Sequence, residues 1–112
     1  MDKQSLNNNQ PYYAVIFTSK RSDKDEPGYL QMASIMTNLA KQQAGFLGVD
    51  SARDEYGLGI TVSYWQNLES IRLWKDNMAH IEAQNGGKQK WYEHYSVRIC
   101  RVEKEYGFES PG

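Results

Sequence analysis

Apolar residues follow different periods in successive stretches of the chain, and each period predicts one type of element. From 12 to 19 the chain is rich in β-branched and aromatic residues, and Ala14–Phe17 is an unbroken apolar run, which is typical of a strand covered on both faces. Pro27 fits the first turn of a following helix, and Gly45 fits its C-terminal cap. Between them, apolar residues recur at spacings of three and four, which predicts an amphipathic helix: Tyr29, Met32, Ile35, Met36 and Leu39.

The middle of the chain has the pattern of a β-hairpin. Two predicted strands, 46–53 and 58–66, are separated by a short turn that ends in Gly57. The second of these strands alternates strictly, so its residues divide between two faces. One face is apolar and consists of Leu58, Ile60, Val62 and Tyr64. The other face is small and polar except at its end, and consists of Gly59, Thr61, Ser63 and Trp65.

A second amphipathic helix and a final strand complete the pattern. Asn67 is a suitable N-cap residue, and Glu69 fits the first helical turn. The apolar stripe of this helix consists of Leu68, Ile71, Trp74, Met78 and Ile81. The pair Gly86-Gly87 should break the helix, and a short helical piece is expected from 88 to 92. The last strand is predicted from 95 to 104.

The predicted order is βαββαβ, which indicates a ferredoxin-like α+β fold with a four-stranded antiparallel sheet and both helices on one face. The second face of the sheet then has no cover within the chain, although the first and last strands carry apolar residues on both sides. A second copy covering that face would produce an isologous dimer and an α/β barrel. We expect one domain over 12–106, flanked by tails at 1–11 and 107–112.

Composition excludes several classes of protein. Lys and Arg number 13 and Asp and Glu number 14, so the net charge of -1 offers no broad basic surface to nucleic acid. The apolar runs are far shorter than the roughly 20 residues of a membrane span. The N-terminal residues are polar and contain no signal-peptide core, so we expect a cytoplasmic protein. A single cysteine, and two histidines without carboxylates at a ligand spacing, predict no internal disulfide and no metal site.

Three short motifs, taken in order, resemble the antibiotic biosynthesis monooxygenase family. They are the segment Gly45–Val49, the strand Ile60–Trp65 that ends in tryptophan, and the acidic helix start Leu68–Ile71. The resemblance covers roughly 12–106 and implies a ferredoxin-like fold that dimerises into an α+β barrel. That family includes cofactor-independent oxygenases of aromatic compounds, quinone oxygenases and haem-degrading enzymes. The resemblance therefore implies an oxidoreductase, a monooxygenase, without specifying its substrate.

His80 is the first candidate for a catalytic residue. It lies on the second predicted helix with Gln84 one turn later, and Trp91 follows at a helical phase. A neutral imidazole in this stripe would accept a substrate proton near pH 7 or ligate a haem iron. The alternative is a partly exposed histidine near a helix end, and a single histidine at a helical phase does not separate the two.

Trp65 is the second catalytic candidate, because it ends a strand face that is otherwise small and polar. With Trp74 and Trp91 it would form flat apolar walls for a planar aromatic ligand, whose oxygen atom the indole N–H groups would orient. The alternative for each tryptophan is core packing, which the position of Trp74 in the apolar stripe favours.

The remaining candidates for substrate binding are Arg98, Tyr64 and Met36. Arg98 and Asp50 are mid-strand charges that would pair with each other or line the polar end of a cavity, unless both face solvent at the barrel rim. Arg53 is a similar but weaker candidate. Tyr64, Tyr92 and Tyr95 would donate hydrogen bonds to a quinone-like oxygen, and Met36 would be adaptable lining.

These residues are compatible with three functions. In a cofactor-independent monooxygenase, a deprotonated aromatic or quinol-like substrate itself reduces dioxygen, with His80 as base and Trp65 as an orienting wall. The second function is haem binding or degradation. In haem-degrading members of the family an Asn of the first strand acts with a Trp and a His of the second helix; here the first strand has no Asn, and Trp74 and His80 are closer together than in those members. The third is a non-catalytic homodimer that binds a small molecule.

Overall fold

The computed structural model describes residues 10–24, 26–85 and 91–111, with the side chains of the middle range described as far as His80. The elements in chain order are β1 (Tyr12–Arg21), α1 (Glu26–Gln42), β2 (Phe46–Arg53), β3 (Leu58–Trp65), α2 (Leu68–Asn85) and β4 (Tyr92–Val102). This order confirms the predicted ferredoxin-like α+β fold.

The predicted start of the last strand is wrong, and the ends of the first, third and last strands differ from the predicted ones by one or two residues. The last strand begins at Tyr92 rather than at 95, because β1 is longer than expected and its final residue, Arg21, pairs with Tyr92 across an irregularity in the ladder. A strand therefore occupies the end of the segment for which a short helical piece was predicted. Residues 88–90 of that predicted piece lie outside the described residues.

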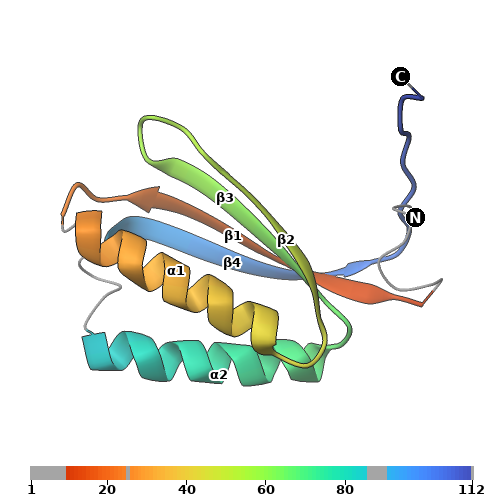
Figure 1. The fold of residues 1–112 in the computed structure, drawn as a ribbon, viewed down its shortest axis with the longest axis horizontal. Helices are drawn as coiled ribbons and strands as arrows, with labels where there is room; N and C mark the ends of the chain where they lie inside the picture. The colour runs from red at the N-terminus through yellow and green to blue at the C-terminus, as the bar shows by residue number, and fades with distance from the viewer. Residues whose placement is uncertain (1–9, 25, 86–90, 112) are drawn as a thin grey trace.

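The sheet has four antiparallel strands in the order β2-β3-β1-β4, and both helices lie on one face of it (Figure 1). Successive residues of a strand point to opposite faces, so each strand divides into a helix-facing and an outward-facing set. The register is continuous across the central strands: Val15 of β1 lies opposite Ser63 of β3 and Ile99 of β4. These three residues face the helices, whereas their immediate neighbours face outward.

Trp65, the last residue of β3, is the centre of the core. Its side chain is 0% exposed and packs with Val15, Ala40 and Ile71. The indole Nε1 N–H donates to Ser63 Oγ at 2.9 Å, so burial leaves this donor satisfied. Phe46 meets the indole edge-on, with ring centroids 5.4 Å apart. Trp65 therefore packs in the core, which is the alternative to a ligand-binding role that the sequence left open.

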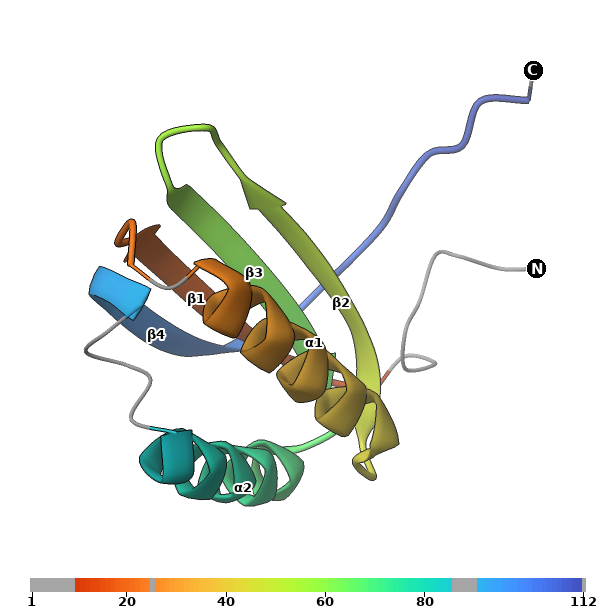
Figure 2. The ribbon, with the colours of Figure 1, turned by 60° about the vertical axis from the view of Figure 1, so that its left-hand side comes forward.

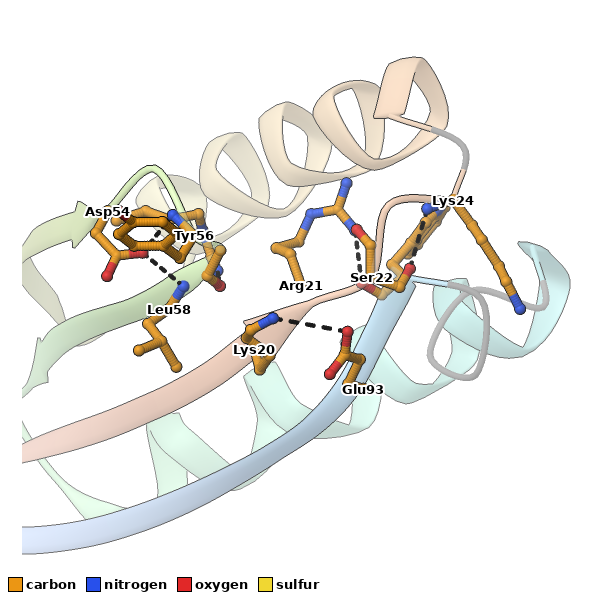
Figure 3. Close-up of polar contacts among 11 residues, drawn as sticks. Lys20, Arg21, Ser22, Lys24, Asp54, Tyr56, Leu58 and Glu93 are labelled. Atoms are coloured by element: carbon orange, nitrogen blue, oxygen red, sulfur yellow. Dashed lines mark hydrogen bonds and ion pairs between the residues drawn. The ribbon is translucent and has the colours of Figure 1, made fainter.

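Polar side chains and a glycine stabilise the turns and the helix start that surround this core. Asn67 caps α2, because its Oδ1 accepts hydrogen bonds from the Ser70 backbone N–H at 2.8 Å and from Ser70 Oγ at 2.9 Å. In the turn between β2 and β3, Asp54 Oδ1 accepts from the backbone N–H groups of Tyr56 and Leu58, both at 2.9 Å (Figure 3). Gly45 ends the α1–β2 connection at a φ of 88°.

The outward face of the sheet carries exposed apolar side chains among polar ones and is not covered by any helix or strand of the described chain; Figure 2 shows α1 and α2 together on the opposite side. Leu58 and Ile60 of β3 are 52% and 50% exposed on this face. Two large aliphatic side chains in one strand, left in water at this level, are typical of a surface that meets another apolar surface.

Gly45 provides a test of how the hairpin is packed against α2. An added Cβ at Gly45 would lie 2.8 Å from the Cβ of Ser70, and the positive φ disfavours any L side chain. We expect Gly45→Ala to lower the free energy of unfolding by about 1–3 kcal/mol in urea titrations. Gly48→Ala is the matched control, because its added Cβ would meet only Tyr64 at 3.9 Å. Equal stability of the two variants would contradict this account.

Candidate functional site

A cavity of about 430 Å³ lies between the two helices and the sheet. It exists because the helix-facing residues of β3 are small along most of the strand: Thr61 and Ser63 line its floor, and the large helix-facing residue, Trp65, lies at the end of the strand. Both helices contribute flexible apolar side chains to its walls, including Met32, Met36 and Met78. The aromatic residues of the lining are Phe17, Tyr29, Phe46, Trp74, Trp91, Tyr92 and Tyr95.

Aromatic side chains of β1, α1 and β4 form one continuous wall of this cavity. Phe17 lies 5.6 Å from Tyr92 and 5.3 Å from Tyr95, measured between ring centroids. Tyr29 of α1 meets Tyr92 edge-on at 6.0 Å and Trp91 at 6.3 Å. Such edge-on contacts hold each ring in a fixed orientation, so this wall is pre-formed rather than assembled around a ligand.

Arg21 fixes one end of the aromatic wall. Although only 7% exposed, its guanidinium is well partnered: it donates to the Trp91 carbonyl at 2.5 Å and pairs with Glu26 at 2.8 Å. It also lies 3.8 Å from the centroid of the Tyr29 ring and donates to the Ser22 carbonyl at 3.0 Å (Figure 3). The end of β1, the start of α1 and the start of β4 are therefore joined through one buried cation.

Two tryptophans form a second wall. Trp74 of α2 lines the cavity, and its ring lies 5.2 Å from Trp65, at an interplanar angle of 35°. The Nε1 N–H of Trp74 is buried and has no hydrogen-bond partner among the residues that the structure describes. An unmade hydrogen bond of this kind costs about 1–3 kcal/mol, which a suitably placed acceptor on a ligand would recover.

The structure brings three of the predicted binding residues to the cavity: Trp74, Trp91 and Met36 all line it. Trp65 is not in the lining but packs directly behind Trp74. His80 has an exposed side chain and is also outside the lining, although the residues that precede it on α2, Met78 and Ala79, are part of it. The side chain of Gln84 lies outside the described residues.

Tyr64 and Arg98 lie on the outward face of the sheet, away from the cavity. Strand alternation decides this, because their neighbours Ser63 and Val97 are the residues that face the helices and line the cavity. Tyr64 Oη donates to Asp50 Oδ2 at 3.1 Å, and Arg98 Nη1 donates to Ser96 Oγ at 3.3 Å.

The suggested pair of Asp50 and Arg98 does not form. Their positions belong to one row across the sheet, Asp50–Val62–Ile16–Arg98. The two charged residues occupy opposite edge strands and are about three strand spacings, or roughly 14 Å, apart.

The residues that sequence reasoning missed are Phe17 and Tyr29 of the aromatic wall, together with Lys75, whereas Tyr92 and Tyr95 were already candidates. The chain has 8 tyrosines, so their abundance concealed which ones share a wall. A usable signal did exist: Tyr95 and Val97 share a face of the last strand, and that face pairs with Phe17.

The outward face carries its own polar cluster at the start of β1. Tyr12 Oη donates to the Glu105 carboxylate at 2.8 Å, and the Tyr12 ring meets Tyr64 edge-on at 6.2 Å. Burial, with the hydrogen bond to Glu105, raises the pKa of Tyr12 to about 12. Burial, with the hydrogen bond to Asp50, also raises the pKa of Tyr64.

Metal and membrane sites are not found in the part of the chain that the structure describes. No three His, Cys, Asp or Glu side chains within it are grouped so that they could hold a metal ion. None of its helices is long and apolar enough to cross a membrane.

The pKa of Tyr12 predicts a pH dependence of stability. Its ordinary value is 10.0 and its folded value is about 12, so the folded protein holds the proton more tightly. The corresponding stability is complete below pH 10 and is lost as the pH rises from 10 toward 12. Urea unfolding of Tyr12→Phe should show a shallower decline over this range than the wild type does. Tyr56→Phe, at an exposed turn, is the control and should keep the wild-type decline.

Comparison with known sequences identifies a relative but no family description. No protein-family model matches the chain. The chain is 44% identical over 109 residues to YqjZ of Bacillus subtilis (strain 168), an uncharacterized protein. The match covers 97% of this chain and 95% of YqjZ. At this identity and coverage the two proteins share a family.

Comparison with solved structures shows the fold. A protein of Shewanella oneidensis matches with a TM-score of 0.69 at 8% identity, covering 84% of this chain and 93% of that protein. SnoaB, a cofactor-independent oxygenase from Streptomyces nogalater, has a TM-score of 0.63 at 7% identity, with coverages of 84% and 94%. MhuD, with two manganese protoporphyrin IX molecules bound per active site, has a TM-score of 0.64 at 16% identity, with coverages of 86% and 99%. The chain therefore belongs to the family of YqjZ and has the antibiotic biosynthesis monooxygenase-like fold that its sequence resemblance implied.

Proposed function

We propose that this protein is a cofactor-independent monooxygenase that binds a planar aromatic or quinol-like molecule in the cavity and oxidises it with dioxygen. The cavity itself carries the proposal: its volume of about 430 Å³ lies within the roughly 300–1,000 Å³ of small-molecule sites, and aromatic rings and methionines form its walls. The fold that it shares with SnoaB, an oxygenase that works without a cofactor, supports the assignment.

Such a reaction requires the protein to bind the substrate, exclude water and remove one proton. A phenol that loses its hydroxyl proton becomes an electron-rich phenolate, which can pass electrons to dioxygen. One oxygen atom then forms a new carbonyl on the ring, and the other leaves as water with the ring hydrogen and the hydroxyl hydrogen. The substrate supplies all four electrons, so the products are a quinone and water and no external reductant is needed.

The tryptophans would bind and orient this substrate. We assign Trp74 and Trp91 to the surfaces that contact the rings, with Met36 as adaptable lining from α1. A substrate oxygen beside Trp74 would supply the acceptor that its buried N–H lacks, after a small rotation of the indole. Trp65 packs behind Trp74, so its proposed role is to position that ring.

His80 is the proposed base. It directly follows the lining residues Met78 and Ala79 on α2, and an imidazole changes its charge near neutral pH. Its side chain is exposed, so catalysis requires the imidazole to turn toward the mouth of the cavity when substrate is bound. Gln84, one helical turn later on α2, is also a proposed binding residue.

Haem is not part of this proposal, because the described residues do not fit it well. The cavity lining described here contains no histidine, and His80 lies outside that lining. β1 also has no asparagine, which the haem-degrading comparison requires.

The oxygenase proposal predicts substrate-dependent consumption of dioxygen. With an oxygen electrode and a panel of phenols and quinols, the wild type should consume oxygen on at least one compound without added cofactor. His80→Ala should lower kcat about a hundredfold or more, as expected for loss of a general base. Trp74→Phe, which keeps a ring but removes the N–H, should lower kcat/KM roughly tenfold.

Asn77→Ala, at an exposed position of the same helix, is the matched control for the two variants. Equal uptake by wild type and His80→Ala would remove His80 as the base. Binding of aromatic compounds without any uptake would instead support a non-catalytic binding protein.

We further propose that a second copy of the chain covers the outward face of the sheet. Leu58 and Ile60 are the most exposed aliphatic residues of that face, and an isologous contact would bury both from each copy. Tyr64 and Arg98 would then lie within or beside the interface instead of in the substrate site.

Sedimentation tests this assembly. We expect the wild type to sediment as a dimer in analytical ultracentrifugation and Ile60→Lys, which places a charge in the apolar patch, to shift the distribution toward monomer. Lys41→Glu, at an exposed end of α1, changes a charge outside the patch and should leave the dimer unchanged. A monomeric wild type at high protein concentration would contradict the proposed assembly.

A further inference from the structure

We infer that the cavity selects an aromatic oxyanion: a planar aromatic molecule that carries a carboxylate or a phenolate when bound, with Arg53 as the residue that recognises the negative charge. This inference deepens the proposed function, since it concerns the substrate class of the same cavity. It rests on the charges of the lining and on the way in which Arg53 is held.

The charged residues of the described lining have one sign. Arg53 of β2 and Lys75 of α2 both line the cavity, and the described lining contains no Asp or Glu. The chain as a whole carries a net charge of -1, so this local excess of positive charge runs against the composition. Both residues are also exposed to solvent, so water screens part of their attraction for an anionic ligand.

Arg53 is held by neutral oxygen atoms. Its Nη2 donates to Ser19 Oγ at 2.9 Å and more weakly to Tyr29 Oη at 3.4 Å, and its Nη1 donates to the Gly57 carbonyl. Within the described residues, no carboxylate forms an ion pair with Arg53. Among the described residues, its positive charge is therefore fixed in place without being neutralised, which is the arrangement expected of a group that binds an anion.

Arg21, at the same end of the cavity, shows the contrast. Its guanidinium is buried and is neutralised by Glu26 at 2.8 Å. Both arginines lie near the Tyr29 ring, at 3.8 Å for Arg21 and 5.9 Å for Arg53. The fold thus uses one guanidinium to tie its elements together and leaves the other without a carboxylate at the cavity.

Gly59 makes room for the guanidinium of Arg53. This glycine lies opposite Arg53 in the β2–β3 ladder, and an added Cβ would come within 2.5 Å of the Arg53 Cζ atom. No side chain larger than hydrogen fits at this position while Arg53 remains where it is. Gly59→Ala would consequently displace the guanidinium and yet keep its charge in the protein.

Lys75 approaches the cavity from the helix layer. It is one residue after Trp74, and the ion pairs formed by the described residues of α2 involve Arg72 rather than Lys75. A mobile ammonium on the helix side and a fixed guanidinium on the sheet side can both reach an anion bound between the two layers. Because the Arg53 guanidinium is the better fixed of the two, we assign the selectivity to Arg53.

Binding of two isosteric probes at pH 7 tests the inference. The probes are 2-naphthoate and 2-naphthamide, which have the same shape and differ in charge, and their dissociation constants are measured by calorimetry. We expect the wild type to bind 2-naphthoate about fivefold more tightly, the upper range for an ion pair of an exposed side chain. Arg53→Gln and Gly59→Ala should both reduce this preference to less than about twofold, with little change in 2-naphthamide binding.

Matched controls separate local from general effects. Arg72→Gln removes an exposed arginine of α2 and should retain the preference for 2-naphthoate. Gly48→Ala adds a methyl group to the same strand as Arg53, near only the Tyr64 ring at 3.9 Å, and should also retain it. Circular dichroism spectra and urea midpoints identify any variant that fails to fold, and Arg53→Lys then serves as a second variant with charge retained and the fork geometry lost.

A third probe distinguishes the two sources of the anion. Absorbance titration of bound 2-naphthol reports whether the cavity lowers the pKa of a phenol, and we expect a decrease in the wild type that Arg53→Gln reverses. A carboxylate preference without this decrease assigns the site to carboxylate substituents, and the reverse result assigns it to the phenolate of the reacting hydroxyl.

The outcomes also separate this inference from the proposed function. Equal binding of 2-naphthoate and 2-naphthamide, with a 2-naphthol pKa that the protein does not lower, would overturn the anion selectivity and leave the aromatic cavity intact. Failure of all three probes to bind would contradict the aromatic site itself. A preference that survives in both Arg53→Gln and Arg53→Lys would overturn the role of Arg53.

Discussion

The two helices of this fold cover only one face of its four-stranded sheet. The exposed apolar surface and the internal cavity both depend on how the strands divide large and small side chains between the two faces. Apart from Trp65 at its end, β3 places its large residues on the outward face and its small ones beneath the helices. The uncovered face consequently exposes apolar side chains to solvent. On the covered face, the side chains are too small to fill the space under the helices. The same alternation therefore produces both the exposed apolar surface and the internal cavity.

The cavity remains open because the side chains around it are tied to one another rather than collapsed into it. Trp65 anchors one side of the core, and Trp74 rests against it. On the other side, Arg21 joins the ends of three elements and holds Tyr29 and Trp91 in place. Fixed rings and small floor residues together keep a space that flexible methionines alone would fill.

Shared fold and shared chemistry must be distinguished in this group of proteins. SnoaB and MhuD have the same fold as this chain at 7% and 16% identity, yet the first is described as cofactor-independent and the second holds metalloporphyrins. The fold provides a chamber between helices and sheet, and the side chains that line it determine what it holds. Here those side chains include aromatic rings, methionines, one arginine and one lysine.

Periodicity alone was sufficient to predict the order of elements, the single-sided helix layer and the alternation of β3, because each depends on residues close in sequence. It also predicted the small, polar strand face from which the cavity floor is made. The site was predicted only in part: Trp74, Trp91 and Met36 reach the cavity, whereas Tyr64 and Arg98 lie on the other face. Which face a strand residue shares with the helices, and which tyrosines meet in one wall, depends on pairing between strands far apart in sequence. The neutral partners of Arg53 come from β1, α1 and the β2–β3 turn, so only the folded chain brings them together around the guanidinium.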